Sequence, residues 1–402
     1  MQIDPKDIHG DTARAADPPG GAFRSRLAQG VVIALALALV LSVPLTDEAW
    51  LRRHFLPEFF APRAEQQRWL TIIHGLALAL AIALWAWVRP LAGRFVGRRT
   101  IGGLALDVGP TVLAIILALG ASELLLRHLP WLAIHQKPGH QEPRRRADTR
   151  LGWEYVPNRA GRVQVAGRTV EYAFDASGRR VRARGETLDP ARPTILFTGE
   201  SIISGDGLPY DQSIPAQVAA RLGFQAANIA VGGYATDQAY LRLKDDLPNF
   251  QRPVAVVILF MPLLFHRNLE HDRPHLDRDL AWRSSAQGWR LLRIFQRVVP
   301  YRSLANSETG VATTQATLRA TIDLARARGA VPLILVPQLT PETAEERVLR
   351  ERILQGLPSL VVPVDPSWHL PGNRHPDARG AEALATAVAD ALRRRLAGSD
   401  PA

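Results

Sequence analysis

The sequence predicts a membrane protein in which three N-terminal transmembrane helices precede one soluble α/β domain. Two observations predict this fold class. Three long apolar runs lie in the first third of the chain, and each is close to the length that crosses a hydrocarbon core of about 30 Å. The rest alternates short apolar runs with helical patterns, which is typical of a parallel sheet covered by helices on both faces.

Composition excludes several kinds of site. The chain has 402 residues, a net charge of +11 and no cysteine, so disulfides, iron–sulfur clusters, a thiolate nucleophile and Cys-ligated zinc are ruled out. An excess of basic residues is typical of proteins that bind nucleic acid or whose loops contact anionic lipid. Basic residues flank the apolar runs and no nucleic-acid motif is present, so we expect the lipid bilayer as partner and no nucleic acid.

The apolar runs are Gly30–Leu45 with residues 27–29, then Trp69–Val88, and then Leu104–Leu126. A cleavable signal peptide is the alternative for the first run. No small-x-small cleavage site precedes Asp47 and Glu48, so we expect a retained helix. The predicted segments are a cytoplasmic tail at 1–26, a three-helix anchor at 27–126, a linker at 127–150 and the α/β domain at 151–398.

Arginines in the short loops predict the orientation. The loop between the second and third runs has no acid and four arginines, Arg89, Arg94, Arg98 and Arg99. Such loops stay in the cytoplasm. We therefore expect a multi-pass protein of the inner (cytoplasmic) membrane, with everything after Leu126 on the periplasmic or extracellular side.

Five short apolar runs in the second part suit buried parallel strands. They are Thr194–Thr198, Ala226–Val231, Val254–Phe260, Val331–Val336 and Leu360–Val364. Alternation around Gly167 predicts a hairpin over Arg162–Phe174. Helices are expected from Thr236, from Thr340-Pro341, and over a last apolar stripe that ends at Gly398.

Two residues with nucleophile and base chemistry fall at loop edges of this pattern. Ser201 follows the first strand, and His375 precedes the final helix. Ligands of parallel sheets bind at the carboxyl ends of the strands. The sequence therefore places a serine and a histidine where a site would form.

Four stretches of the domain resemble the SGNH, or GDSL-type, hydrolases, and more narrowly their membrane-anchored bacterial members. They are Leu151-Gly152-Trp153 with Pro157-Asn158, Gly199-Glu200-Ser201, Asn228 to Tyr234, and His375-Pro376 with Gly380. The resemblance covers Leu151 to the C-terminus. It implies a flavodoxin-like three-layer α/β/α domain and acyl transfer without a cofactor or metal.

The resemblance also implies the roles of the site residues. Ser201 would attack an ester carbonyl, and His375 would take the serine proton and return it to the leaving alcohol. The backbone N–H groups of Ser201 and Gly233 would face the developing oxyanion.

Three positions depart from the family pattern. Glu200 stands where the family has aspartate. Leu263 occupies the place of the usual oxyanion asparagine, and Asn268 is the nearest substitute. Asn373 replaces the aspartate before the histidine. An asparagine can orient an imidazole but cannot neutralise its cation, so a Ser-His dyad oriented by Asn373 is expected.

The polar stretch from His266 to Asp277 offers a metal site as an alternative. Pro274 would break the helix that such a site needs, so we expect a loop over the active-site edge whose Arg and His residues meet an anionic substrate.

We predict a membrane-anchored esterase or acyltransferase that acts on an acylated glycan or lipid of the cell envelope. The alternatives are a catalytically inactive SGNH-like binding domain and, through Asp107, Glu123 and His74, a membrane transport component. Association of the helices with a partner membrane protein is left open.

Overall fold

The computed structural model describes residues 21–47, 50, 55–57, 63–98, 101–128, 144–165, 167–268, 273–285, 301–303 and 307–398. The chain divides into two compact units. One contains Met1–Pro57, Ala61–Leu132 and Arg290–Arg302, and the other contains Glu58–Phe60, Ala133–Trp289 and Ser303–Ala402.

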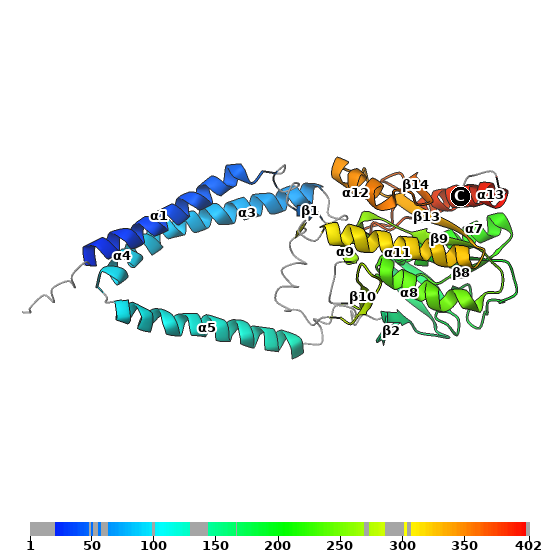
Figure 1. The fold of residues 1–402 in the computed structure, drawn as a ribbon, viewed down its shortest axis with the longest axis horizontal. Helices are drawn as coiled ribbons and strands as arrows, with labels where there is room; N and C mark the ends of the chain where they lie inside the picture. Colours follow the sequence, from blue (N-terminus) through cyan, green and yellow to red (C-terminus); the bar gives the residue numbers. More distant parts are fainter. Residues whose placement is uncertain are drawn as a thin grey trace, which may run out of the picture. The chain divides into compact units, whose positions relative to one another are not determined.

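The first unit is helical (Figure 1). Its elements are α1 (Gly21–Leu45), β1 (Phe55–Pro57), α3 (Arg63–Ala83), the π-helical turn η1 (Leu84–Val88), α4 (Arg89–Arg98), α5 (Ile101–His128) and β12 (Tyr301–Ser303), which pairs with β1. Helix α1 packs against α3 and α4. Large apolar side chains still face outward, and Leu41, Ile82 and Leu125 are each more than half exposed. A surface of this kind is costly in water.

Of the three expected membrane spans, two have candidates among the described residues. Ala22–Leu45 and Gln67–Ala92 are long and apolar enough to cross a membrane, whereas α5 offers only the shorter apolar stretch Leu113–Leu126. Helix α5 itself runs over Ile101–His128, but its side chains are described only at 113–126, so the third span stays a prediction. The side chain of Asp107 lies outside the described residues.

The second unit is built on an eight-stranded sheet with the order β14-β13-β9-β7-β8-β6-β5-β4. The strands are β4 (Ala160–Val165), β5 (Arg168–Phe174), β6 (Arg180–Val181), β7 (Thr194–Thr198), β8 (Gln225–Asn228), β9 (Pro253–Leu259), β13 (Val331–Gln338) and β14 (Ser359–Pro363). Two small ribbons pair β2 (Arg145–Asp148) with β3 (Gly152–Tyr155) and β10 (His275–Leu276) with β11 (Trp282–Arg283).

The five predicted runs form β7, β8, β9, β13 and β14, and these strands pair with one another only in parallel. Taken in chain order, their spatial order is 2-1-3-4-5, the flavodoxin-like order. The predicted hairpin is β4–β5, but it joins the same sheet through β6 by antiparallel pairing. The sheet is therefore mixed, and its parallel part matches the expectation.

Helices cover this sheet on both faces (Figure 1). They are α6 (Ser201–Ser204), η3 (Tyr210–Gln212), α7 (Ile214–Leu222), α8 (Thr236–Asp246), η4 (Leu247–Asn249), α9 (Pro262–Arg267), α11 (Ser307–Ala327), α12 (Ala344–Leu354) and α13 (Ala378–Leu396). Helix α7 packs on α13, and α8 packs on α11. Right-handed crossovers put these two pairs on opposite faces.

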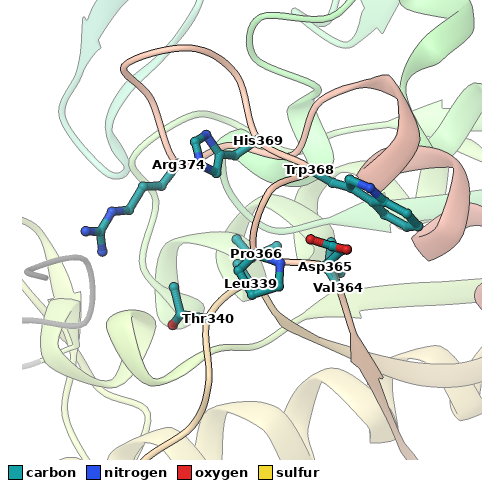
Figure 2. A pocket seen from close by; sticks show the side chains of 8 residues that line it. All are labelled: Leu339, Thr340, Val364, Asp365, Pro366, Trp368, His369 and Arg374. Carbon is teal, nitrogen blue, oxygen red and sulfur yellow. The ribbon is translucent and has the colours of Figure 1, made fainter. Parts of the chain in front are cut away.

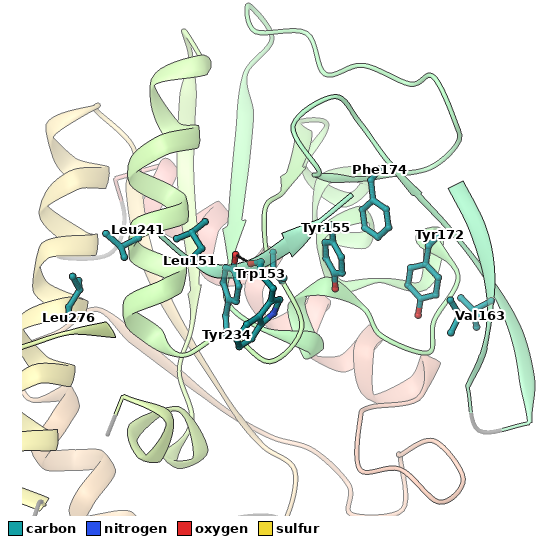
Figure 3. Close-up of a cluster of buried hydrophobic side chains, with 11 residues drawn as sticks. Leu151, Trp153, Tyr155, Val163, Tyr172, Phe174, Tyr234, Leu241 and Leu276 are labelled. Carbon is teal, nitrogen blue, oxygen red and sulfur yellow. Dashed lines mark hydrogen bonds between the residues drawn. The ribbon is translucent and has the colours of Figure 1, made fainter. Parts of the chain in front are cut away.

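A cluster of buried aromatic side chains lies under the loops that follow β7 and β8 (Figure 3). The ring of Tyr155 stacks on Phe174 at 4.3 Å between centroids. Its hydroxyl contacts Ser204 Oγ at 2.7 Å and accepts the Gly232 N–H at 3.1 Å. The Tyr172 hydroxyl accepts the Gly207 N–H at 2.7 Å. Strands β3 and β5 therefore hold both loops by hydrogen bonds from a rigid apolar base.

One buried cation closes the loop after Ser201. Arg180 is 1% exposed, and its guanidinium donates to the carbonyls of Ser204 (2.6 Å), Gly205 (2.7 Å) and Leu208 (2.5 Å). Gly205 has φ +74°, and a Cβ there would lie 2.5 Å from Arg180 Nη1. Only glycine leaves room for the guanidinium at this turn.

Arg180→Gln is expected to lower the free energy of unfolding of the α/β domain by about 3 kcal/mol or more, because carbonyls lose charged donors in a dry site. The measurement is chemical unfolding of the full chain in detergent, followed by tryptophan fluorescence. The exposed Arg184→Gln is the control and should change stability by less than about 0.5 kcal/mol. Equal stability of the two variants would contradict the proposed anchoring of the loop.

Candidate active site

Strand β7 delivers Ser201 to the carboxyl edge of the sheet. Gly199 follows the strand with φ +149°, and a Cβ on it would lie 2.6 Å from the Cβ of Leu259. Glu200 then caps α6, because its side chain accepts the Ile202 N–H at 3.0 Å. Ser201 is the first residue of α6 and is 8% exposed. The tight passage at Gly199 explains why glycine stands before the acid and the serine.

His375 is presented by the loop between β14 and α13. The loop folds back on itself, since Leu370 N–H donates to His375 O at 2.9 Å and Asn373 N–H donates to Leu370 O at 3.0 Å. Asp377 then caps α13 by accepting the N–H groups of Arg379 and Gly380. The histidine is thus held two residues before a well-formed helix start.

These two loops bring the serine and the histidine together. His375 Nε2 lies 2.6 Å from Ser201 Oγ, and His375 Nδ1 contacts Asn373 Oδ1. The same Asn373 oxygen accepts the backbone N–H of His375 at 3.1 Å, which assigns the amide orientation. An amide oxygen only accepts, so Nδ1 carries a proton and Nε2 is the ring nitrogen that faces the serine hydroxyl.

Glu200 contacts the serine from the other side, a contact that the sequence did not predict. Ser201 Oγ lies within hydrogen-bond distance of Glu200 Oε2, which also accepts from Arg267 Nη1 at 3.3 Å. Burial alone would raise the pKa of Glu200, but the positive charge of Arg267, that of His375 when it is protonated, and the hydrogen bonds from Ser201 and the Ile202 N–H hold that pKa below its usual range. The carboxylate is therefore ionised at neutral pH, next to the hydroxyl.

A second buried carboxylate, Asp206, lies on the loop after α6. Arg144 Nη1 is 3.3 Å from Asp206 Oδ1, and Ser204 Oγ is 3.5 Å from the same oxygen. Burial would raise the pKa of Asp206, whereas Arg144, Arg145 and His375 lower it below its usual value. Arg144 and Arg145 belong to the predicted linker at 127–150, so the last part of that segment is built into the domain, with residues 145–148 as β2.

Gly233 lies in the turn after β8. Its φ is +85°, and a Cβ there would be 3.3 Å from Trp153 Cζ2. Its carbonyl accepts from Arg273 Nη1 at 2.8 Å, and the neighbouring Gly232 gives its N–H to Tyr155. The turn is thus fixed on three sides. Donation from the Gly233 N–H to an oxyanion stays a prediction.

Asn268 does not take part in the site by any contact of its amide. Its Oδ1 accepts the Thr236 N–H at 3.1 Å, and its Nδ2 donates to Thr314 Oγ1 at 2.8 Å. The side chain is buried and ties the end of α9 to α8 and α11. The suggestion of Asn268 as an oxyanion donor is therefore replaced by a structural role.

A cavity of about 160 Å³ lies beside the loop of His375 (Figure 2). Its wall mixes Trp368, Val364 and Pro366 with polar groups, including Arg374 and His369. Because Arg374 directly precedes His375, a group held in this cavity would lie beside the loop that carries His375. The cavity offers space for part of a substrate.

The polar stretch considered for a metal is only partly described. His275 Nδ1 faces the Arg273 carbonyl at 3.0 Å, while His271 and the side chain of His266 lie outside the described residues. No three His, Asp or Glu side chains of the described part come together as metal ligands.

No protein-family model and no curated protein match the chain. Solved structures similar to it include three GDSL-type or carbohydrate esterase proteins. One is assigned to the G-D-S-L lipolytic family from Desulfitobacterium hafniense DCB-2 (13% identity, 50% of this chain and 99% of that chain, TM-score 0.33). Another is an acetyl xylan esterase from Butyrivibrio proteoclasticus (10% identity, 53% of this chain and 66% of that chain, TM-score 0.34). The third is a family two carbohydrate esterase from Cellvibrio japonicus (13% identity, 54% of this chain and 65% of that chain, TM-score 0.33).

These neighbours are of the SGNH type that the sequence motifs resemble. The identities confine the likeness to the fold, and the TM-scores are too low for it to support an activity. The function proposed below therefore rests on the geometry around Ser201.

Proposed function

We propose that the chain is a membrane-anchored SGNH-like serine esterase or acyltransferase that acts on an ester of a cell-envelope glycan or lipid. The observation that carries the proposal is the 2.6 Å contact between Ser201 Oγ and His375 Nε2, with Asn373 on the other ring nitrogen. A weak nucleophile such as serine needs an adjacent base held in a fixed tautomer, and these contacts supply one.

The reaction follows from this proton arrangement. Ser201 Oγ attacks the ester carbonyl while its proton passes to His375 Nε2, and the carbonyl becomes an oxyanion. Collapse of the tetrahedral intermediate expels the alcohol, which takes the proton from Nε2 and leaves an acyl-serine. Water or an acceptor hydroxyl then attacks the acyl-serine with the same histidine as base, which gives hydrolysis or acyl transfer.

The N–H groups of Ser201 and Gly233 are the proposed oxyanion donors. One such donor is typically worth about 2.7–4 kcal/mol of barrier. Gly233 belongs to a turn fixed by Arg273 and Tyr155, so its N–H needs little reorganisation during the reaction.

Glu200 supplies the negative charge that Asn373 cannot. When His375 takes the serine proton it becomes a cation, and an ionised carboxylate on the far side of the serine stabilises that cation. At an effective dielectric constant of about 20, two unit charges about 5 Å apart interact by about 3 kcal/mol. The proposed site is therefore a Ser-His dyad whose counter-charge is Glu200, the residue that precedes the serine in the sequence.

A catalytically inactive binding domain is the second candidate. It is favoured by Asn373 in place of a carboxylate, and by the commitment of Asn268 to Thr236 and Thr314. It requires no transfer of the serine proton, so covalent labelling of Ser201 separates the two candidates.

A fluorophosphonate probe is expected to label the wild-type full chain at Ser201, because the base raises the nucleophilicity of the hydroxyl. His375→Ala should lower the labelling rate by at least about 100-fold, in the range of general-base contributions, and Ser201→Ala should abolish it. The measurement is mass spectrometry of the labelled peptide. If the wild-type protein is labelled no faster than His375→Ala, the result would favour the inactive binding domain.

Glu200→Gln is expected to lower kcat/KM for a short-chain nitrophenyl ester by about 100-fold, since the counter-charge of about 3 kcal/mol is removed. Asn373→Asp alone should not reduce activity. Added to Glu200→Gln, it should recover at least about tenfold, because it restores a carboxylate beside the imidazole. A Glu200→Gln variant as active as wild type would show instead that Glu200 competes with His375 for the serine proton.

We also propose that the α/β domain lies outside the cytoplasm, which requires α5 (Ile101–His128) to cross the inner membrane after the two candidate spans. The support is the arginine-rich segment from Arg89 to Arg99 after the second span, since such segments stay cytoplasmic. A reporter that is active only in the periplasm, fused after Ala402, should be active. Activity of a cytoplasm-only reporter at the same place would reverse the topology.

A further inference from the structure

A second and larger cavity, of about 410 Å³, lies next to the turn that carries Gly233. Its walls come from β2, from the start of β3 and from the segment before β10. The residues that matter here are Arg145, Arg146, Asp148, Trp153 and Arg273. None of them contacts Ser201 or His375 in the proposed acyl transfer, and only Arg273, through Gly233 O, touches the oxyanion turn.

The lining is strongly cationic. It holds three guanidinium groups and one carboxylate, Asp148. Asp148 Oδ1 accepts the N–H groups of Arg150 and Leu151, but the carboxylate keeps its negative charge, so three guanidinium groups and one carboxylate leave a net charge of about +2. Arg146 pairs with Glu154 at 2.5 Å. Arg145 and Arg273 therefore dominate the charge that the cavity offers to a ligand.

Arg145 and Arg273 both pack against the Gly232–Gly233 turn. Arg273 is 9% exposed, lies 5.3 Å from the centroid of the Trp153 ring and donates to Gly233 O at 2.8 Å. The guanidinium of Arg145 is so close to the turn that a Cβ on Gly232 would lie 2.5 Å from Nη2. Trp153 Nε1 donates to Gly232 O at 3.1 Å. Any anion on these cations would lie directly beside the proposed oxyanion donor.

The carboxylate nearest to Arg145 on the other side is Asp206. It would lie 3.1 Å from the same Cβ on Gly232, so it shares the field of Arg145. Asp206 is paired with Arg144 at 3.3 Å. One carboxylate between two arginines leaves a net positive charge at this edge of the cavity.

We propose that this cavity is a subsite for a negatively charged group, a carboxylate or phosphate, on the glycan that bears the ester. The inference deepens the proposed function and rests on it. A glycan fits better than a lipid chain, because arginines and the hydroxyls of Thr149 and Ser285 share the wall with the apolar rings of Trp153 and Pro274. Guanidinium groups bind such anions through paired N–H donors. The subsite would thus select acidic over neutral acylated sugars.

The test is direct binding to the full chain in detergent, measured by calorimetry with trigalacturonate and with its uncharged counterpart, galactotriose. We expect the acidic sugar to bind at least about tenfold more tightly, a difference in binding free energy of about 1.4 kcal/mol. Its binding should weaken when salt is added. Arg145→Gln should remove most of this preference. Arg145→Lys, which keeps the charge, should retain part of it. The exposed Arg319→Gln, outside both cavities, should leave the preference unchanged.

Equal affinity for the two sugars, or no binding of either, would overturn the subsite. So would equal loss of preference in Arg145→Gln and Arg319→Gln. Binding to vesicles of phosphatidylglycerol without binding to trigalacturonate would assign the charge to a lipid headgroup and overturn the glycan. Fluorophosphonate labelling of Ser201 is read in parallel. If Ser201 is labelled but the acidic sugar is not preferred, only the proposed subsite is contradicted. If the acidic sugar is preferred but Ser201 is not labelled, only the proposed catalysis is contradicted.

Discussion

The nucleophile loop depends on one buried guanidinium. Arg180 lies on β6, and its pairing with Asn228 joins the antiparallel strands to the parallel part of the sheet. The side chain of Asn228 donates to Ile203 O at 3.1 Å, while Arg180 holds the carbonyls of Ser204, Gly205 and Leu208. Removing a cation from water is costly, and burial lowers the pKa of Arg180. That cost is offset only while the loop keeps this shape, so the loop and the sheet junction stabilise each other.

The distribution of charge around Ser201 is likewise constrained by burial. Glu200 and Asp206 are both buried on the loops at the carboxyl edge, and each has an arginine within 3.3 Å. The field of His375 lowers the pKa of both carboxylates. A third carboxylate behind the imidazole would add negative charge to a site that already holds two. Asn373 orients the ring without adding that charge, which accounts for an amide at this position.

Much of the domain could be predicted because its signals are local. Apolar runs of five to seven residues predict the five parallel strands, and the Gly167 turn predicts the β4–β5 hairpin. Ser201 and His375 could be placed because each stands beside a strand end or a helix start. The start of α12 was placed too early at Thr340, because the capping box of Thr343 with Glu346 competes with Pro341. Arg144 and Arg145 escaped notice because a short ribbon strand after a Pro-rich segment has no periodicity. The roles of Glu200 and Asn268 depend on contacts across the fold, which no spacing in the sequence reveals.

The geometry around Ser201 favours the proposed enzyme over the binding domain on physical grounds. Ionised Glu200 is 2% exposed, and Gly199 adopts a φ that other residues avoid. Buried charge and unusual backbone geometry lower stability and persist where the surroundings enforce them. A domain that only binds a glycan could use the arginine-lined cavity and would need neither feature. Both features converge on the Ser201 hydroxyl, which also contacts His375. Their stability cost is understandable if that hydroxyl reacts, and it has no counterpart in a purely binding role.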